Sequence, residues 1–173
     1  MFAIGYAPPG WNGLITAMGR SGVPPHLLVE AGLAGVDTAG PKQRYYDRFR
    51  NRVVFPIVNV YGRVVGFGAR ALGDSMPKYL NSPESPVFNK RTNLYGLNLA
   101  ADRIRADGAA VVVEGYLDVV AAHQAGLANA VATLGTALTT EQARLVSRYA
   151  QRVVMCYDAD RAGSAATERG VGM

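Results

Sequence analysis

Two continuous apolar runs, at 109–113 and 152–157, constrain the fold of this chain more than any other feature. The runs read AAVVV and RVVMCY, without the alternation of a half-exposed strand. Hydrophobicity on both faces is typical of parallel strands buried between helices. A further strand is predicted at 129–133, with helices at 92–107, at about 117–125 and from Thr139 onward, where Gln142 completes a capping box. The order strand, helix, strand, helix, strand predicts an α/β fold with a parallel sheet.

Acidic residues directly follow two of these predicted strands. Glu114 and Asp118 come after the first strand, and Asp158 and Asp160 come after the last. Because ligands collect at the carboxyl ends of parallel strands, we expect these four side chains to share one rim. Clustered carboxylates repel one another unless a cation lies among them, and their oxygens suit Mg²⁺, with Mn²⁺ as an alternative. The sequence therefore predicts a divalent-metal site.

A DxD motif after a strand is not specific by itself. It occurs in haloacid-dehalogenase-type phosphatases, glycosyltransferases and response regulators, and the two aspartates could also simply cap the following helix. Arg161 stands where the phosphatases want Thr or Val, which argues against that family. Glu114 at the end of another strand favours a metal site over a structural cap.

Composition limits the class of protein. The 173 residues include one cysteine, Cys156, so an internal disulfide is excluded and zinc is not expected. The first residues lack the pattern of a secretory signal, and no run approaches the roughly 20 apolar residues that span a bilayer. We therefore expect a soluble cytoplasmic protein without a membrane partner.

Charge is uneven along the chain. Residues 41–105 hold twelve Lys or Arg against four acids, whereas residues 106–173 hold five Arg against seven acids. A basic half beside an acidic half suggests a polyanionic substrate, although solvated surface is the alternative. We expect a mixed α+β basic part with an exposed connection at 34–44, a hairpin around residues 60–62 and a loop at 76–91. Arg48, Arg50 and Arg52 would share one face of an extended chain.

The metal motif resembles that of the Toprim domain, in which a glutamate follows the first strand and a DxD follows a later one. Upstream blocks narrow the resemblance to bacterial DnaG-type primases. In chain order these blocks are FAIGYAPPGW (2–11), YDRFRNRVVFPI (46–57), GRVVGFGAR (62–70), PKYLNSPES (77–85), FNKRTNLYGL (88–97), EGYLDVVAAHQAG (114–126), VATLGTALT (131–139) and CYDADRAG (156–163). The resemblance covers nearly the whole chain.

The resemblance implies synthesis of RNA primers on single-stranded DNA from ribonucleoside triphosphates, at the replication fork in the nucleoid. Glu114, Asp158 and Asp160 would be catalytic and would hold two Mg²⁺ ions, with Asp118 in support. The implied nucleotide-binding residues are Lys78, Tyr79, Asn81, Lys90 and Tyr116, and the implied template-binding residues are Arg48, Arg50, Arg70 and Trp11. Another Toprim enzyme, such as a nuclease or topoisomerase, and a binding module without catalysis are the alternatives.

The resemblance also implies a domain division. Residues 1–107 would form the basic N-terminal subdomain and residues 108–173 a Rossmann-like Toprim domain without its last strand. The family's zinc-binding module, its fourth Toprim strand and its helicase-binding C-terminal module have no counterpart here. We therefore expect this chain to be weakly active alone and to contact the replicative helicase only through the module that it lacks.

Overall fold

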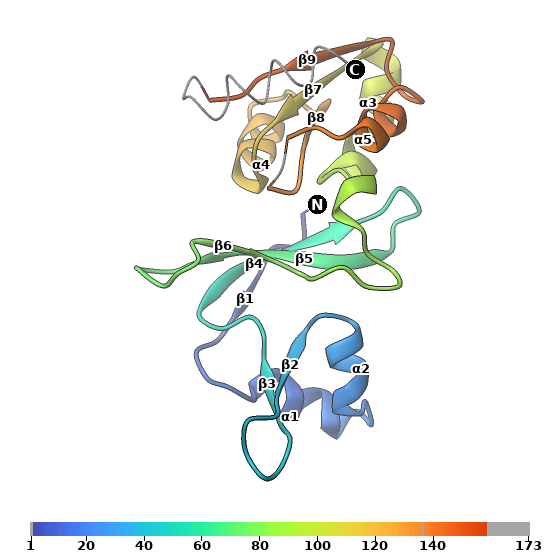
Figure 1. Ribbon diagram of the computed structural model, residues 1–173. Helices are drawn as coiled ribbons and strands as arrows, with labels where there is room; N and C mark the ends of the chain where they lie inside the picture. Colours follow the sequence, from blue (N-terminus) through green and yellow to red (C-terminus); the bar gives the residue numbers. More distant parts are fainter. Residues whose placement is uncertain (1, 136, 159–173) are drawn as a thin grey trace. The chain divides into compact units, whose positions relative to one another are not determined.

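The computed structural model describes residues 2–135 and 137–158 (Figure 1). Asp160, one of the expected metal ligands, lies outside the described residues. The chain divides into two compact units. The parallel-sheet unit comprises Met1–Phe2, Ile57–Val64 and Asn89–Met173, and the antiparallel-sheet unit comprises Ala3–Pro56 and Val65–Phe88. In the described part of the chain, no helix is long and apolar enough to cross a bilayer.

The parallel-sheet unit contains the predicted three-stranded sheet, in the order β8-β7-β9. Strand β7 (Ala109–Val113) pairs in parallel with β8 (Ala130–Ala132) on one side and with β9 (Arg152–Met155) on the other. Helix α4 (Tyr116–Gln124) connects β7 to β8, and α5 (Thr140–Val146) lies between β8 and β9 in the chain. The observed strands lie within two residues of the predicted ones, so the α/β fold class is confirmed.

The core of this unit forms where helix α3 (Leu97–Asp107) packs on the sheet. Leu97, Ala100 and Ile104 are buried, since they lie three or four residues apart on one face of the helix. They pack with Val112 of β7 and Val131 of β8 in one apolar cluster. The spacing of these three side chains therefore accounts for the face of α3 that packs against the strands.

The start of α3 differs from the prediction, which placed it near Thr92. Residues Lys90–Thr92 form a 3₁₀ turn, η1, and Tyr95 then pairs with Ala132 of β8 through two backbone hydrogen bonds of 2.8 and 3.0 Å. Gly96 has a φ of 81° and lets the chain turn into the helix. The free edge of β8 thus holds residue 95 in extended form and delays the helix.

The antiparallel-sheet unit is built on a four-stranded sheet in the order β1-β4-β5-β6. Its strands are β1 (Gly5–Ala7), β4 (Arg52–Val58), β5 (Val64–Ala71) and β6 (Tyr79–Asn81). Neighbours β4 and β5 are joined at residues 59–63, as the hairpin pattern predicted. The expected loop at 76–91 was only partly right, because β6 pairs antiparallel with β5 inside it.

The predicted exposed connection at 34–44 is only partly right, because residues 38–43 are exposed and irregular whereas strands flank them. Strand β2 (Ala34–Asp37) pairs antiparallel with β3 (Arg44–Asp47), beside helices α1 (Gly13–Arg20) and α2 (Pro25–Glu30). A Cβ on Gly35 would lie 2.3 Å from the ring of Tyr46. The two strands therefore form a hairpin that depends on the absence of a side chain at residue 35.

The prediction that three arginines share one face of an extended chain is wrong. Asn51 has a φ of 49°, which interrupts the alternation between Arg50 and the start of β4 at Arg52. Arg52 is only 6% exposed, whereas Arg48 and Arg50 are half-buried. The three side chains consequently differ in burial, although all three line one pocket.

Candidate functional site

The carboxyl edge of the parallel sheet brings Glu114 and Asp158 together. Glu114 directly follows β7, and Asp158 follows its neighbour β9. The backbone N–H of Asp158 donates a hydrogen bond of 3.1 Å to Oε1 of Glu114. Glu114 is half-buried and the Asp158 side chain is exposed, so the edge offers carboxylate oxygens to a cation. Among the described residues, which omit Asp160, no three His, Cys, Asp or Glu side chains cluster as a metal site.

Asp118 supports the turn that follows Glu114. Its Oδ2 accepts a hydrogen bond of 2.9 Å from the backbone N–H of Gly115, in the first turn of α4. A carboxylate at this position also favours the helix start electrostatically. The contact orients the chain immediately after Glu114.

Three tyrosines lie around this edge. Tyr116 is 4% exposed, and its ring packs edge to face on Tyr95 with centroids 4.8 Å apart. Burial raises the pKa of both phenols well above the usual value, and burial also raises the pKa of Tyr157, with the Glu114 charge adding to the shift. These phenols therefore stay neutral at neutral pH. The Tyr116 ring lies in the interior of the unit, which does not favour direct contact with a nucleotide.

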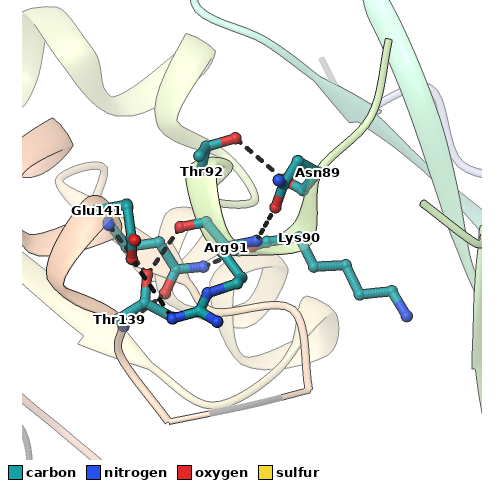
Figure 2. A network of polar contacts seen from close by, with 7 residues as sticks. Asn89, Lys90, Arg91, Thr92, Thr139 and Glu141 are labelled. Carbon is teal, nitrogen blue, oxygen red and sulfur yellow. Dashed lines mark hydrogen bonds and ion pairs between the residues drawn. The ribbon is translucent and has the colours of Figure 1, made fainter. Parts of the chain in front are cut away.

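Lys90, on the same unit, starts the 3₁₀ turn η1. Asn89 caps this turn, because its Oδ1 accepts a hydrogen bond of 2.8 Å from the backbone N–H of Arg91. Figure 2 shows the Lys90 side chain extending away from the polar network around the turn. The network fixes the backbone of the turn, and the turn sets the direction in which the Lys90 side chain leaves the backbone.

The antiparallel-sheet unit brings other predicted nucleotide-binding residues onto adjacent strands. Tyr79 lies opposite Arg70, and Asn81 lies opposite Gly68, in the pairing of β5 with β6. Lys78 precedes β6, and its carbonyl accepts a hydrogen bond of 2.8 Å from the N–H of Ala71. Arg70 and Lys78 line an open pocket of about 400 Å³ with residues 71–76. The two cations outnumber the one acid of the lining, Asp74, which suits an anionic ligand.

Sequence reasoning missed the role of Arg52 beside this pocket. Its Nη1 donates a hydrogen bond of 2.8 Å to the Pro77 carbonyl and a longer one of 3.5 Å to the Lys78 carbonyl. Burial lowers the pKa of Arg52, and the charge of Arg50 contributes to the shift. Arg52 thus holds the backbone beside Lys78. The one sequence signal for this role is that Arg52 lies in a basic stretch.

Trp11 and Arg50 form an aromatic and cationic surface. The guanidinium carbon of Arg50 lies 4.0 Å from the centroid of the Trp11 ring and 5.7 Å from that of Tyr46. Trp11 is 64% exposed, and it lines an open pocket of about 350 Å³ together with Arg48, Arg50 and Arg52. Of the four predicted template-binding residues, Arg70 alone does not line this pocket. Exposed aromatic rings beside arginines suit single-stranded nucleic acid.

The sequence profiles of two protein families match the chain. The profile of the DNA primase catalytic core, N-terminal domain, matches residues 1–101, and that of Toprim-like proteins matches residues 111–172. The chain is 52% identical over 169 residues to the DNA primase of Clostridium acetobutylicum and 51% identical over 172 residues to that of Deinococcus radiodurans. Each match covers 98% of this chain, but only 28% and 30% of the respective relatives.

Solved structures give the same result. A DnaG primase catalytic domain bound to single-stranded DNA superposes with a TM-score of 0.87 at 46% identity, covering 98% of this chain and 52% of that one. The RNA polymerase domain of Mycobacterium tuberculosis primase superposes with a TM-score of 0.88 at 37% identity, covering 99% of this chain and 58% of that one. Primases match the chain over nearly its full length, and its parallel sheet carries Glu114 and Asp158 at the carboxyl edge. The chain therefore belongs to the DNA primase catalytic core family.

Proposed function

We propose that this chain forms part of a DNA primase, which makes RNA primers on single-stranded DNA by nucleotidyl transfer. The observation that carries the proposal is the hydrogen bond between the Asp158 backbone and Glu114, because it joins the ends of two parallel strands that each supply a carboxylate. The identity of about 50% with DNA primases supports the same reaction. The chain would act in the cytoplasm, at the replication fork.

Divalent metal ions fit the carboxylate edge. Glu114, Asp158 and Asp160 would hold Mg²⁺, or Mn²⁺ in its place, through hard oxygen ligands, and we expect no zinc site in this chain. A bound divalent ion supplies charge stabilisation to the reacting phosphate. The protein's own part is orientation: Asp118 holds the backbone after Glu114, and the Tyr116 ring packs against Tyr95.

The basic side chains would hold the substrates. Lys78, Tyr79, Asn81 and Lys90 are proposed as nucleotide-binding residues for the ribonucleoside triphosphate, with Tyr116 in a supporting position. Trp11, Arg48, Arg50 and Arg70 are proposed to guide the DNA template, since a solved relative is bound to single-stranded DNA. The RNA primer is the product, and contact with the helicase would need a module beyond the family segments matched here.

Nucleotide incorporation on single-stranded DNA tests the proposal. This chain is compared with one that is extended through a fourth Toprim strand. Both lengths are measured unmutated, with Glu114→Gln and with Asp158→Asn. We expect weak activity from the shorter chain, and a loss of at least about a hundredfold from the extended chain with either change, since metal ligands act in the chemical step. Asp102→Asn is the matched control, because the Asp102 side chain is 98% exposed and pairs only with Arg105 among the described ion pairs. Full incorporation by the extended Glu114→Gln protein would contradict the proposal.

A further inference from the structure

A fully buried glutamine joins helix α5 to the turn that carries Lys90. Gln142 is 0% exposed. Its Nε2 donates hydrogen bonds of 2.9 Å to the Lys90 carbonyl and 2.8 Å to the Asn93 carbonyl, and its Oε1 accepts one of 3.0 Å from the backbone N–H of Thr139. Both amide hydrogens and the amide oxygen are therefore engaged.

Further contacts hold the same turn. The Thr139 hydroxyl donates a hydrogen bond of 2.7 Å to the Arg91 carbonyl and accepts one of 3.1 Å from the Gln142 backbone. Arg91 and Glu141 form an exposed ion pair at 4.0 Å, which contributes little by itself. Beyond the turn, Tyr95 pairs with β8. The backbone from residue 90 to residue 95 is thus fastened at several points.

The amide is needed by the turn rather than by the helix. A capping box requires only a side-chain oxygen at this position, which glutamate supplies as well as glutamine. Glutamate cannot donate to the two carbonyls, whereas glutamine donates to both. Glutamine rather than glutamate is therefore required by the two carbonyls of residues 90–93 that accept its hydrogen bonds.

Helix α5 begins on the side of the sheet that also bears the carboxylates. Strands β7, β8 and β9 are parallel, so the segments that follow them leave from one edge. The loop after β8 leads to Thr139 and α5, while Glu114 and Asp158 follow the other two strands. Gln142 consequently ties the Lys90 turn to an element that starts from the candidate metal-binding edge.

We propose that Gln142 is a positioning residue that sets the place of Lys90 for nucleotide binding. The inference rests on the proposed function, in which Lys90 contacts the triphosphate. A lysine side chain loses rotamer entropy when it binds a phosphate, and a fixed backbone limits the further cost of ordering the turn. Gln142 acts through the Lys90 backbone and does not itself touch the nucleotide.

Nucleotide binding by the chain tests this inference. A fluorescent ATP analogue is titrated, with Mg²⁺ present, into the wild type, Gln142→Met, Lys90→Ala and the double variant. We expect each single change to weaken binding about fivefold to tenfold, and the double variant to bind no more weakly than Lys90→Ala, because residues in one network are not additive. Gln124→Met is the matched control, since Gln124 is exposed at the end of α4.

A second readout does not depend on the nucleotide. Hydrogen exchange of the amides at 90–93 should be faster in Gln142→Met and unchanged in Gln124→Met. Thr139→Val, which replaces the hydroxyl of a half-buried residue with a methyl group, serves if Gln142→Met does not fold. A twofold to threefold loss of affinity is expected, because the turn loses the hydrogen bond to the Arg91 carbonyl while the Gln142 side-chain contacts remain.

Four results overturn the inference. If the wild type binds nucleotide and a folded Gln142→Met binds it with the same affinity, the inference is overturned while the proposed function stands. Additive losses of affinity in the double variant have the same meaning. If Thr139→Val has to be used, unchanged nucleotide affinity in that variant has the same meaning. A wild type that binds no nucleotide refutes the assigned role of Lys90 in the proposed function, and the inference falls with it.

Discussion

Asp47 caps a helix that lies far from it in the sequence. It is 5% exposed, its Oδ2 accepts a hydrogen bond of 2.7 Å from the N–H of Leu14, and its Oδ1 accepts one of 3.1 Å from that of Ile15. Both donors lie in the first turn of α1, where the Asn12 side chain makes no cap hydrogen bond within the described residues. The Asp47 backbone also donates a hydrogen bond of 2.7 Å to the Trp11 carbonyl.

The contacts set the expected cost of replacing Asp47. Each hydrogen bond to a charged group contributes about 1.5–3 kcal/mol, and a carboxylate at a helix N-terminus adds about 0.3–1 kcal/mol. In the variant, water can hydrogen-bond to the N–H groups of the exposed helix and so offset part of this loss. We therefore expect Asp47→Ala to lower the free energy of unfolding by about 3–5 kcal/mol. Asp47→Asn keeps one acceptor oxygen and should cost about 1.5–3 kcal/mol.

Urea unfolding followed by tryptophan fluorescence measures these costs. Trp11 is the chain's only tryptophan and lies in the same unit as Asp47, so its signal reports that unit. Asp37→Ala is the control, because the exposed Asp37 carboxylate accepts a single bond of 2.9 Å from Ala39 N–H and should cost less than about 1 kcal/mol. Equal costs for Asp47→Ala and Asp37→Ala would refute the reasoning, as would a larger cost for Asn than for Ala at residue 47.

Three further changes have defined outcomes. Gly96→Ala should destabilise the parallel-sheet unit by about 2–4 kcal/mol in urea unfolding followed by circular dichroism, because the residue has a φ of 81° and its Cβ would lie 2.9 Å from Val119; a cost below about 1 kcal/mol would contradict this. Arg52→Met should weaken nucleotide binding about threefold to tenfold, because the loop before Lys78 loses a buried donor; unchanged affinity in a folded variant would show that the loop is held otherwise. Burial raises the pKa of Tyr116, so the stability that its protonated form contributes is intact below the unfolded pKa of about 10 and is lost progressively as the pH rises from there toward the raised folded pKa; Tyr116→Phe should flatten the fall in unfolding free energy above about pH 10, and an unchanged slope would disprove the link.

The parallel sheet could be predicted because its information is local. The AAVVV and RVVMCY runs are apolar on both faces, and Gly108 and Gly126 end the helices that precede β7 and β8 with positive φ. Since parallel strands end at one edge, the relative places of Glu114 and Asp158 followed from chain order alone. The family resemblance added roles for these residues, not their positions.

The elements that escaped prediction depend on single backbone positions and distant contacts. Strands β2 and β3 are short, and their pairing depends on the close approach of Gly35 to Tyr46. The burial of Arg52 follows from the positive φ of Asn51, which an arginine-rich stretch does not reveal. The capping role of Asp47 likewise cannot be predicted from its neighbours in the sequence, because the helix start that it caps lies more than thirty residues away.

The two candidate nucleotide lysines share one structural arrangement, although they lie on different units. Arg52 donates to the carbonyls at 77 and 78, and Gln142 donates to those at 90 and 93, so in each case a buried donor fixes the main chain that carries the lysine. Lysine is a flexible point charge that forms no fixed fork, so the backbone is where a protein can restrict it. The donors lie 25 and 52 residues from the first carbonyl that each one holds, which explains why local patterns do not show them. Loss of either donor should therefore reduce nucleotide affinity while the carboxylates that act in the chemical step remain in place.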